Sequence, residues 1–227
     1  MAQYFKTWWT IIFRPIYFYA KLKEESWQDD SLTFLLSTSW ILGFVATLIV
    51  FVIQYVPIGG TLVEGIAGFK FILILPVLFA LAFVFFLITF LILGGAFTCA
   101  FFVLFYSTAT TLNQIYSLLG GKGSLNRMIQ SVFYSSAVSL VALLILFLMV
   151  LTRYAGMDFM LFRYGYNFLY FSMLLYIYGL LAVAGRLNYK ISKAKSFLGA
   201  IAPIIVLLIF GLIFDKIALP KLQSWIT

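Results

Sequence analysis

The stretch FILILPVLFALAFVFFLITFLILGGAFTCAFFVLFYSTATTLNQIYSLL, residues 71–119, decides the fold of this chain, because it contains no charged side chain. A membrane-spanning helix needs about 20 predominantly apolar residues. The block is much longer than that. It either crosses a membrane twice, with a hairpin at Gly94 and Gly95, or crosses once and continues as a long helix beyond the bilayer.

The composition of the whole chain is that of a membrane protein. It is 64% hydrophobic and 10% charged, with a mean hydropathy of +1.11, whereas soluble domains are about 45–50% apolar and about 25% charged. Further long apolar blocks flank the central one, and a Gly-rich turn at 56–68 precedes it. We expect spans at about 32–55, 71–95 with a helical extension to 119, 128–151, 164–183 and 197–214.

The distribution of charge decides between one and two crossings of residues 71–119, because cytoplasmic loops carry an excess of Lys and Arg. With one crossing and a cytoplasmic N-terminus, ten basic residues lie inside and five outside, whereas two crossings give eight and seven. One crossing fits better. The sequence therefore predicts an all-α integral membrane protein, a five-span helical bundle over residues 31–227.

Residues 1–30 predict a different kind of segment. Aromatic and basic side chains alternate here, a mixture that suits the headgroup layer of a membrane better than its centre. We expect a short interfacial helix that is broken near Pro15, because proline disrupts a helix interior. The side chains concerned are Trp8, Trp9, Tyr17 and Tyr19 with Lys6, Arg14, Lys21 and Lys23.

The composition also disfavours several kinds of chemistry. The chain has no histidine and a single cysteine, Cys99, so catalytic triads and zinc or haem sites lack their commonest participant. We expect no catalytic residue, metal ligand or cofactor. The net charge of +8 indicates lipid headgroups and no nucleic acid, because the basic residues flank apolar blocks. Carboxylates are absent from the span centres, with Asp215 expected to end the last span, which disfavours an ion-coupled transporter.

The segment GGKGS, residues 120–124, raises the question of a phosphate-binding loop. A Walker loop needs a glycine five residues before its Gly-Lys pair and Ser or Thr directly after the lysine. Those positions hold Tyr116 and Gly123. A turn fits better, in which Gly120 and Gly121 end one helix and Ser124 caps the next.

Two sets of residues are candidates for a functional site. A basic set on the inner side is expected to bind anionic lipid headgroups or a protein partner: Lys122, Arg127, Arg186, Lys190, Lys193 and Lys195. A polar set falls at i, i+3, i+4 and i+7, which places it on one helix face: Ser107, Thr110, Thr111 and Gln114. That face either lines a polar groove for lipid headgroups or, as we favour, hydrogen-bonds to neighbouring helices.

An aromatic stripe is predicted on the fourth span. It favours helix packing and interfacial anchoring over a ligand groove, and it comprises Tyr164, Phe168, Phe171, Leu175 and Tyr178.

The order of these features resembles the Yip family of integral membrane proteins, named for interaction with Ypt/Rab GTPases. The resemblance is carried by IIFRPIYFYAKL at 11–22, by the overlong second block and by GGKGSLNRMIQSVFYSSAVSL at 120–140. It implies five spans and a cytoplasmic N-terminus. The N-terminal region is short, and Val138 stands where a proline is often found, so the chain resembles a compact prokaryotic member of the cytoplasmic (inner) membrane, without the Rab-dependent role of eukaryotic members.

The expected function is that of a non-enzymatic membrane scaffold that binds lipid, or a membrane or cytosolic protein partner, through its inner basic surface. The alternative is a transporter or lipid translocator that uses the polar face on the second helix. An enzyme is disfavoured, because the spans offer no nucleophile with an adjacent base. Small residues such as Gly94 and Gly211 allow helix association, either within the chain or in a homo-oligomer.

Overall fold

The structure, a computed structural model, describes residues 2–64, 66 and 68–226. This part of the chain is almost entirely helical and contains no strand. Five helical stretches are long and apolar enough to cross a membrane, which confirms the predicted all-α, five-span class. They are Asp30–Thr61, Phe69–Leu118, Leu125–Ala155, Phe159–Tyr189 and Lys193–Lys221.

Three of these stretches change helix type along their length. The first consists of α3 (Asp30–Val50), the π-helix η1 (Phe51–Tyr55) and α4 (Val56–Val63). The third consists of α6 (Leu125–Ser135), the 3₁₀-helix η2 (Ser136–Val141) and α7 (Ala142–Ala155). After α8 (Phe159–Tyr189), the last consists of α9 (Lys193–Ile213), the π-helix η3 (Phe214–Ala218) and α10 (Leu219–Lys221), followed by α11 (Gln223–Ile226).

The Gly-rich turn predicted to begin at residue 56 is helical at its start. Pro57 lies in the first turn of α4, directly after the π-helix η1, and local π-helical adjustments accommodate the missing N–H of a proline inside a membrane helix. Glycines such as Gly59 and Gly60 are more frequent in membrane helices than in soluble ones. The first span therefore extends further than the Gly and Pro content suggests.

The uncharged block forms one continuous helix, α5 (Phe69–Leu118), of 50 residues, which makes it about 75 Å long. No hairpin forms at Gly94, which instead packs against α3. A Cβ atom on Gly43 would lie 2.9 Å from the Gly94 Cα, so the two glycines let the helix backbones cross closely. The small residue at 94 thus serves association within the chain.

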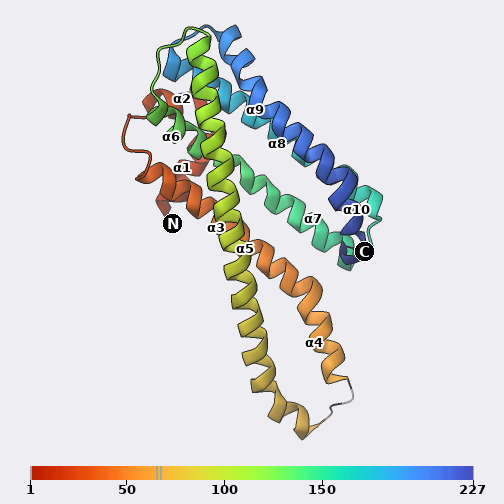
Figure 1. Ribbon diagram of the computed structural model, residues 1–227. Helices are drawn as coiled ribbons and strands as arrows, with labels where there is room; N and C mark the ends of the chain where they lie inside the picture. Colours follow the sequence, from red (N-terminus) through yellow and green to blue (C-terminus); the bar gives the residue numbers. More distant parts are fainter. Residues whose placement is uncertain (1, 65, 67, 227) are drawn as a thin grey trace.

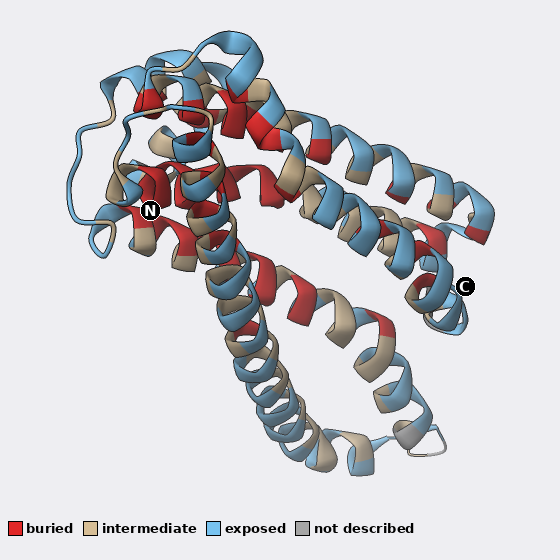
Figure 2. Ribbon diagram, turned by 45° about the horizontal axis from the view of Figure 1, so that its top comes forward, coloured by how far each residue is buried: buried red, intermediate tan, exposed pale blue. Residues whose placement is uncertain are grey.

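The helices form two arms that meet at one end of the molecule (Figure 1). In one arm α3 and α4 run beside α5, and in the other α7, α8 and α9 pack together. Buried residues gather where the arms meet (Figure 2). At this junction every residue from Met128 to Leu140 is buried, so the α6–η2 segment is the centre of the core.

The N-terminal segment forms two helices, α1 (Ala2–Phe13) and α2 (Pro15–Lys21), which are separated at Arg14 as the proline predicts. One face packs on the junction, with Ile11 and Tyr19 buried and the Trp8 indole donating to the Ala137 carbonyl at 2.9 Å. The other face exposes large apolar side chains that suit an interfacial position: Phe5, Trp9, Phe13 and Ile16.

Candidate functional site

The loop between α5 and α6 has the turn chemistry that the sequence predicts. Gly120 adopts a φ of 87°, and the N–H groups of Gly120 and Gly121 donate to the carbonyls of Ser117 (3.0 Å) and Tyr116 (2.9 Å). This pair of hydrogen bonds defines a Schellman motif, for which glycine is the preferred residue. Ser124 caps α6, because its Oγ accepts a hydrogen bond from the Arg127 N–H at 3.1 Å.

The same loop is hydrogen-bonded to the C-terminal end of α8. The Asn188 side chain donates to the Ser124 carbonyl at 2.9 Å and accepts from the Ser124 N–H at 3.4 Å. The Lys122 N–H donates to the Tyr189 carbonyl at 3.2 Å. Gly123 lies against the Tyr189 ring, where a Cβ atom would approach within 2.7 Å. Two basic segments far apart in the sequence are therefore held side by side.

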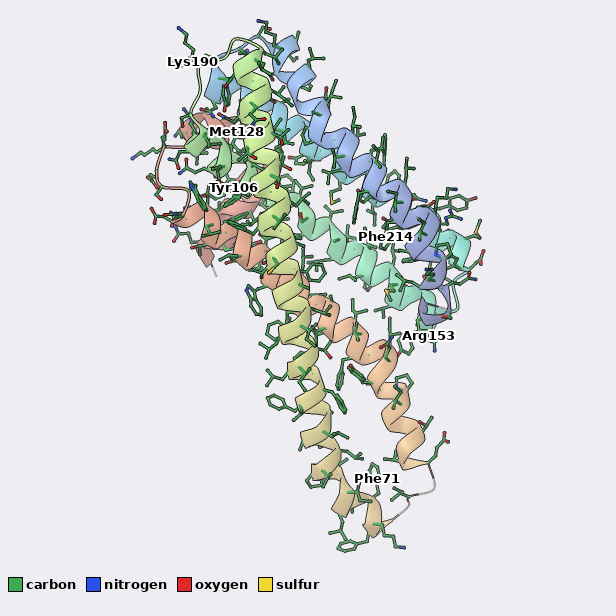
Figure 3. All side chains as sticks on the ribbon, in the orientation of Figure 1. Phe71, Tyr106, Met128, Arg153, Lys190 and Phe214 are labelled. Atoms are coloured by element: carbon green, nitrogen blue, oxygen red, sulfur yellow. The ribbon has the colours of Figure 1, made fainter. Side chains whose placement is uncertain are left out.

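The six predicted basic residues lie at this end of the molecule, and we call them the basic surface: Lys122, Arg127, Arg186, Lys190, Lys193 and Lys195. All are exposed except the half-buried Arg127. Figure 3 shows Lys190 near the end of the molecule opposite to Phe71. In the described part of the chain, the salt bridges are formed by Arg163 and Lys216 with Asp215, so none of the six basic residues is in an ion pair. A carboxylate does approach the loop, since that of Glu24 accepts a hydrogen bond from the Ser124 hydroxyl.

Two members of the basic surface also contact the backbone. The Lys195 ammonium donates to the Leu119 carbonyl at 2.8 Å, and the Arg127 guanidinium donates to the Tyr19 carbonyl at 3.4 Å. A cation at the C-terminus of a helix is favoured by the helix dipole. Lys195 and Arg127 therefore combine charge with a structural role, whereas Lys122, Lys190 and Lys193 make no side-chain hydrogen bond to the described residues.

Tyr116 fixes α5 between α8 and α9 directly below the basic surface. Its side chain is fully buried, and its hydroxyl lies 3.2 Å from the Leu181 carbonyl and 3.0 Å from the Ser196 carbonyl. The ring is cradled by two glycines, because a Cβ atom on Gly185 or Gly199 would approach it within 2.3 or 2.4 Å. The basic surface thus rests on a closely packed junction.

The predicted polar face of α5 is not a groove and does not bond to other helices. Ser107, Thr111 and Gln114 are exposed, and Thr110 donates to the Ser107 carbonyl of its own helix at 2.9 Å. The inward face of this part of α5 is occupied by buried, mainly apolar residues at helical spacing, namely Phe105, Ala109, Leu112 and Tyr116. Since mainly apolar side chains fill the core, the polar set faces outward.

The character of the exposed surface changes along α5. Exposed residues in its first half are large and apolar, as at Phe79, Phe83 and Leu91, whereas beyond Leu104 the exposed residues include Ser107 and Gln114. Lipid favours the first pattern and water the second. The exposed surface of α5 therefore changes from uniformly apolar to mixed toward the end that carries the basic surface.

A cavity of about 400 Å³ lies between the two arms. Its wall is mainly apolar and comes from α5, α8 and α9 together with α7, including Phe101, Leu104, Tyr170, Leu174 and Phe210. The polar set on α5 does not line it. The predicted aromatic stripe on α8 faces away from it, since Tyr164, Phe168, Phe171 and Leu175 are exposed.

An ion pair that the sequence analysis missed joins α8 to the last span. Asp215, expected to end that span, lies inside it and is buried. Its carboxylate accepts hydrogen bonds from the Arg163 guanidinium at 2.8 and 2.7 Å and from Asn167 at 3.2 Å. The sequence did place Arg163 and Asp215, which carry opposite charges, at the outer ends of two spans, and this could have indicated the pair. Because the carboxylate is fully engaged, we assign the pair a structural role.

Further association between spans also occurs within the chain. Gly211 packs against the Tyr170 ring, which a Cβ atom would approach within 2.2 Å, and the Tyr170 hydroxyl donates to the Leu207 carbonyl at 2.6 Å. Within the described residues, no group of three or more His, Cys, Asp or Glu side chains is placed to hold a metal ion.

The chain matches no protein-family model, no curated protein and no solved structure. Residues 120–140, which carry part of the resemblance to the Yip family, form the loop between α5 and α6 and the buried α6–η2 segment. The resemblance stays a prediction, and function has to be argued from the geometry of this end of the molecule.

Proposed function

We propose that this is a non-enzymatic membrane protein whose basic surface binds anionic lipid headgroups at the cytoplasmic face of the membrane. The observation that carries the proposal is the gathering of six basic residues, from two loops and the adjoining ends of α6, α8 and α9, at one end of the bundle. None of them forms an ion pair in the described part of the chain. Each Lys or Arg near an anionic leaflet contributes about 1 kcal/mol of attraction.

The neighbouring helices support a position at headgroup depth. Trp9, Phe13 and Ile16 on α1 and α2 are exposed, and such side chains insert into the boundary between headgroups and acyl chains. Both helices pack on the junction that carries the basic surface. The excess of basic residues at this end favours the cytoplasmic side of a prokaryotic inner membrane.

The fixed loop geometry favours a scaffold. The bonds between Asn188 and Ser124 hold the two loops together before any ligand arrives, so binding requires little ordering of the backbone. A surface of this kind can organise anionic lipid around the bundle without a conformational change.

The test compares two triple variants with equal changes of charge. The first replaces Lys122, Lys190 and Lys193 by Gln, and the control replaces Lys70, Arg153 and Lys221, which lie outside the basic surface. Binding of phosphatidylglycerol to the purified full chain is measured by native mass spectrometry. We expect the first variant to bind at least tenfold more weakly and the control to bind as the parent does, because three attractions of about 1 kcal/mol are removed. Equal binding by both variants would refute the proposal.

A second candidate is lipid translocation, which the cavity of about 400 Å³ between the arms favours. An apolar cavity beside α5 can hold an acyl chain while a headgroup crosses, although the polar set does not line it. Reconstituted vesicles with a fluorescent phospholipid test this candidate. Accelerated movement of the lipid between leaflets, abolished by Leu174→Trp in the cavity wall, supports it, and no acceleration by the parent protein excludes it.

A further inference from the structure

A second cavity, of about 280 Å³, lies where α2 and the segment that follows it approach α6. Unlike the cavity between the arms, it has charged side chains in its wall. The residues that matter are Lys21, Lys23, Glu25, Asp30, Gln130 and Tyr134. None of them belongs to the basic surface, so this cavity is a separate feature of the junction.

Gln130 gives the cavity a buried acceptor without a donor. Only 4% of this residue is exposed. Its amide nitrogen donates to the Glu25 carbonyl at 2.7 Å, while its Oε1 atom has no hydrogen-bond partner among the described residues. A buried polar atom that lacks a partner is costly and is rare in native structures. A ligand with an N–H or O–H group would satisfy it.

The walls of the cavity carry charges of both signs that do not neutralise one another. Lys21 donates to the Tyr17 hydroxyl at 2.8 Å on α2. Glu25 precedes α3 and its backbone carbonyl accepts from Gln130, and Asp30 is the first residue of α3, so both carboxylates come from the segment that follows α2. No ion pair joins these lysines to these carboxylates, because the salt bridges of the described residues all involve Asp215. A ligand with a cation and an anion a few atoms apart would pair both sets.

The cavity also lies next to the interfacial surface. Ile16 and Tyr17 on α2 are exposed, and Tyr17 itself contributes to the wall. Phospholipid headgroups are the abundant zwitterions at this depth. Among them, a quaternary ammonium has no N–H group to donate to Gln130, whereas a primary ammonium has three.

We propose that this cavity binds the headgroup of an aminophospholipid, a primary ammonium linked to a phosphodiester, as in phosphatidylethanolamine. The ammonium donates to Gln130 Oε1 and pairs with Glu25 and Asp30. The phosphodiester pairs with Lys21 and Lys23. The inference goes beyond the proposed function and uses none of its six basic residues.

Lipid titration of the purified full chain, followed by native mass spectrometry, tests the proposal. Phosphatidylethanolamine is compared with phosphatidylcholine of the same acyl chains, which differs only in the three N-methyl groups. We expect at least tenfold tighter binding of phosphatidylethanolamine, and equal binding of the two lipids would overturn the proposal. Soluble glycerophosphoethanolamine is the competitor. If it displaces the lipid at comparable concentration, the site serves a soluble compound and the lipid assignment fails.

Two variants locate the site. Gln130→Met keeps the volume of the side chain but removes the acceptor, and we expect it to lose the preference for phosphatidylethanolamine. Because Gln130 is buried and this variant could misfold, Lys21→Gln combined with Lys23→Gln changes exposed residues only and should weaken binding of phosphatidylethanolamine at least fivefold. The Lys122, Lys190 and Lys193 variant should keep the preference. If both cavity variants still bind phosphatidylethanolamine more tightly than phosphatidylcholine, the lipid binds elsewhere and the proposal is refuted.

Discussion

Replacement of Gly185 by Ala should destabilise the junction through a single contact, with the Tyr116 ring. The new Cβ atom would lie 2.3 Å from Tyr116 Cζ, and the ring cannot retreat because Gly199 on α9 is equally close on another side. Overpacking of a dense core costs about 1–3 kcal/mol. We expect Gly185→Ala to lower the free energy of unfolding by this amount.

Two variants, Tyr116→Phe and Tyr116→Ala, separate the contribution of the Tyr116 hydroxyl to stability from that of its ring. Tyr116→Phe removes a hydroxyl that lies 3.0 Å from the Ser196 carbonyl, and hydrogen bonds between membrane helices average about 0.6 kcal/mol. Tyr116→Ala removes a fully buried ring, which costs about 3–5 kcal/mol for large aromatic residues. In that background the methyl group of Gly185→Ala enters empty space, so its own cost should vanish.

The double-mutant cycle is measured by equilibrium unfolding in mixed micelles, with increasing sodium dodecyl sulfate in a mild detergent and tryptophan fluorescence as the signal. We expect a coupling of about 1–3 kcal/mol between Tyr116→Ala and Gly185→Ala. Additivity within about 0.5 kcal/mol would show that the ring and the glycine do not meet, and would refute the packing of α5 between α8 and α9.

Three further predictions concern other contacts. Asn188→Leu should free the loop at Ser124, so amide hydrogen exchange there should speed up and phosphatidylglycerol binding should weaken with the basic charges unchanged. Asp215→Asn should lower the melting temperature by leaving Arg163 without its carboxylate, and an added Arg163→Gln change should restore part of the loss. Burial raises the pKa of the Tyr19 hydroxyl above its usual value of 10.0, so its contribution to stability is complete below pH 10 and is lost as pH rises further. Tyr19→Phe should therefore reduce the loss of stability above pH 10, as measured by protease cleavage of the N-terminal segment.

The fold was predictable because its strongest signals are compositional and local. The apolar blocks of the sequence, the uncharged one at 71–119 among them, predict five helices long enough to cross a membrane. Backbone requirements identify Gly120 and Ser124 as the ends of helices. The helical start of the 56–68 segment was missed, since Gly and Pro stop helices more reliably in water than in a membrane.

The sequence identified the residues of the candidate site better than it identified their arrangement. The basic residues gather as expected, because short loops on the same side of a bundle must be neighbours. The polar set on α5 was misread, because spacing reveals which residues share a face but not which way that face turns. The pair Arg163–Asp215 and the cavity around Gln130 depend on helix rotation, which one sequence does not specify.

Photo-crosslinking in native membranes tests most directly whether the basic surface faces anionic lipid. Leu125, exposed in the first turn of α6, lies in sequence between Lys122 and Arg127 and can be replaced by a photoreactive residue, with the adducts identified by mass spectrometry. Our proposal predicts adducts with anionic phospholipids, which diminish when Lys122, Lys190 and Lys193 are changed to Gln. A dominant protein adduct, with no anionic lipid attached, would contradict it and would identify the basic surface as a docking site for that protein.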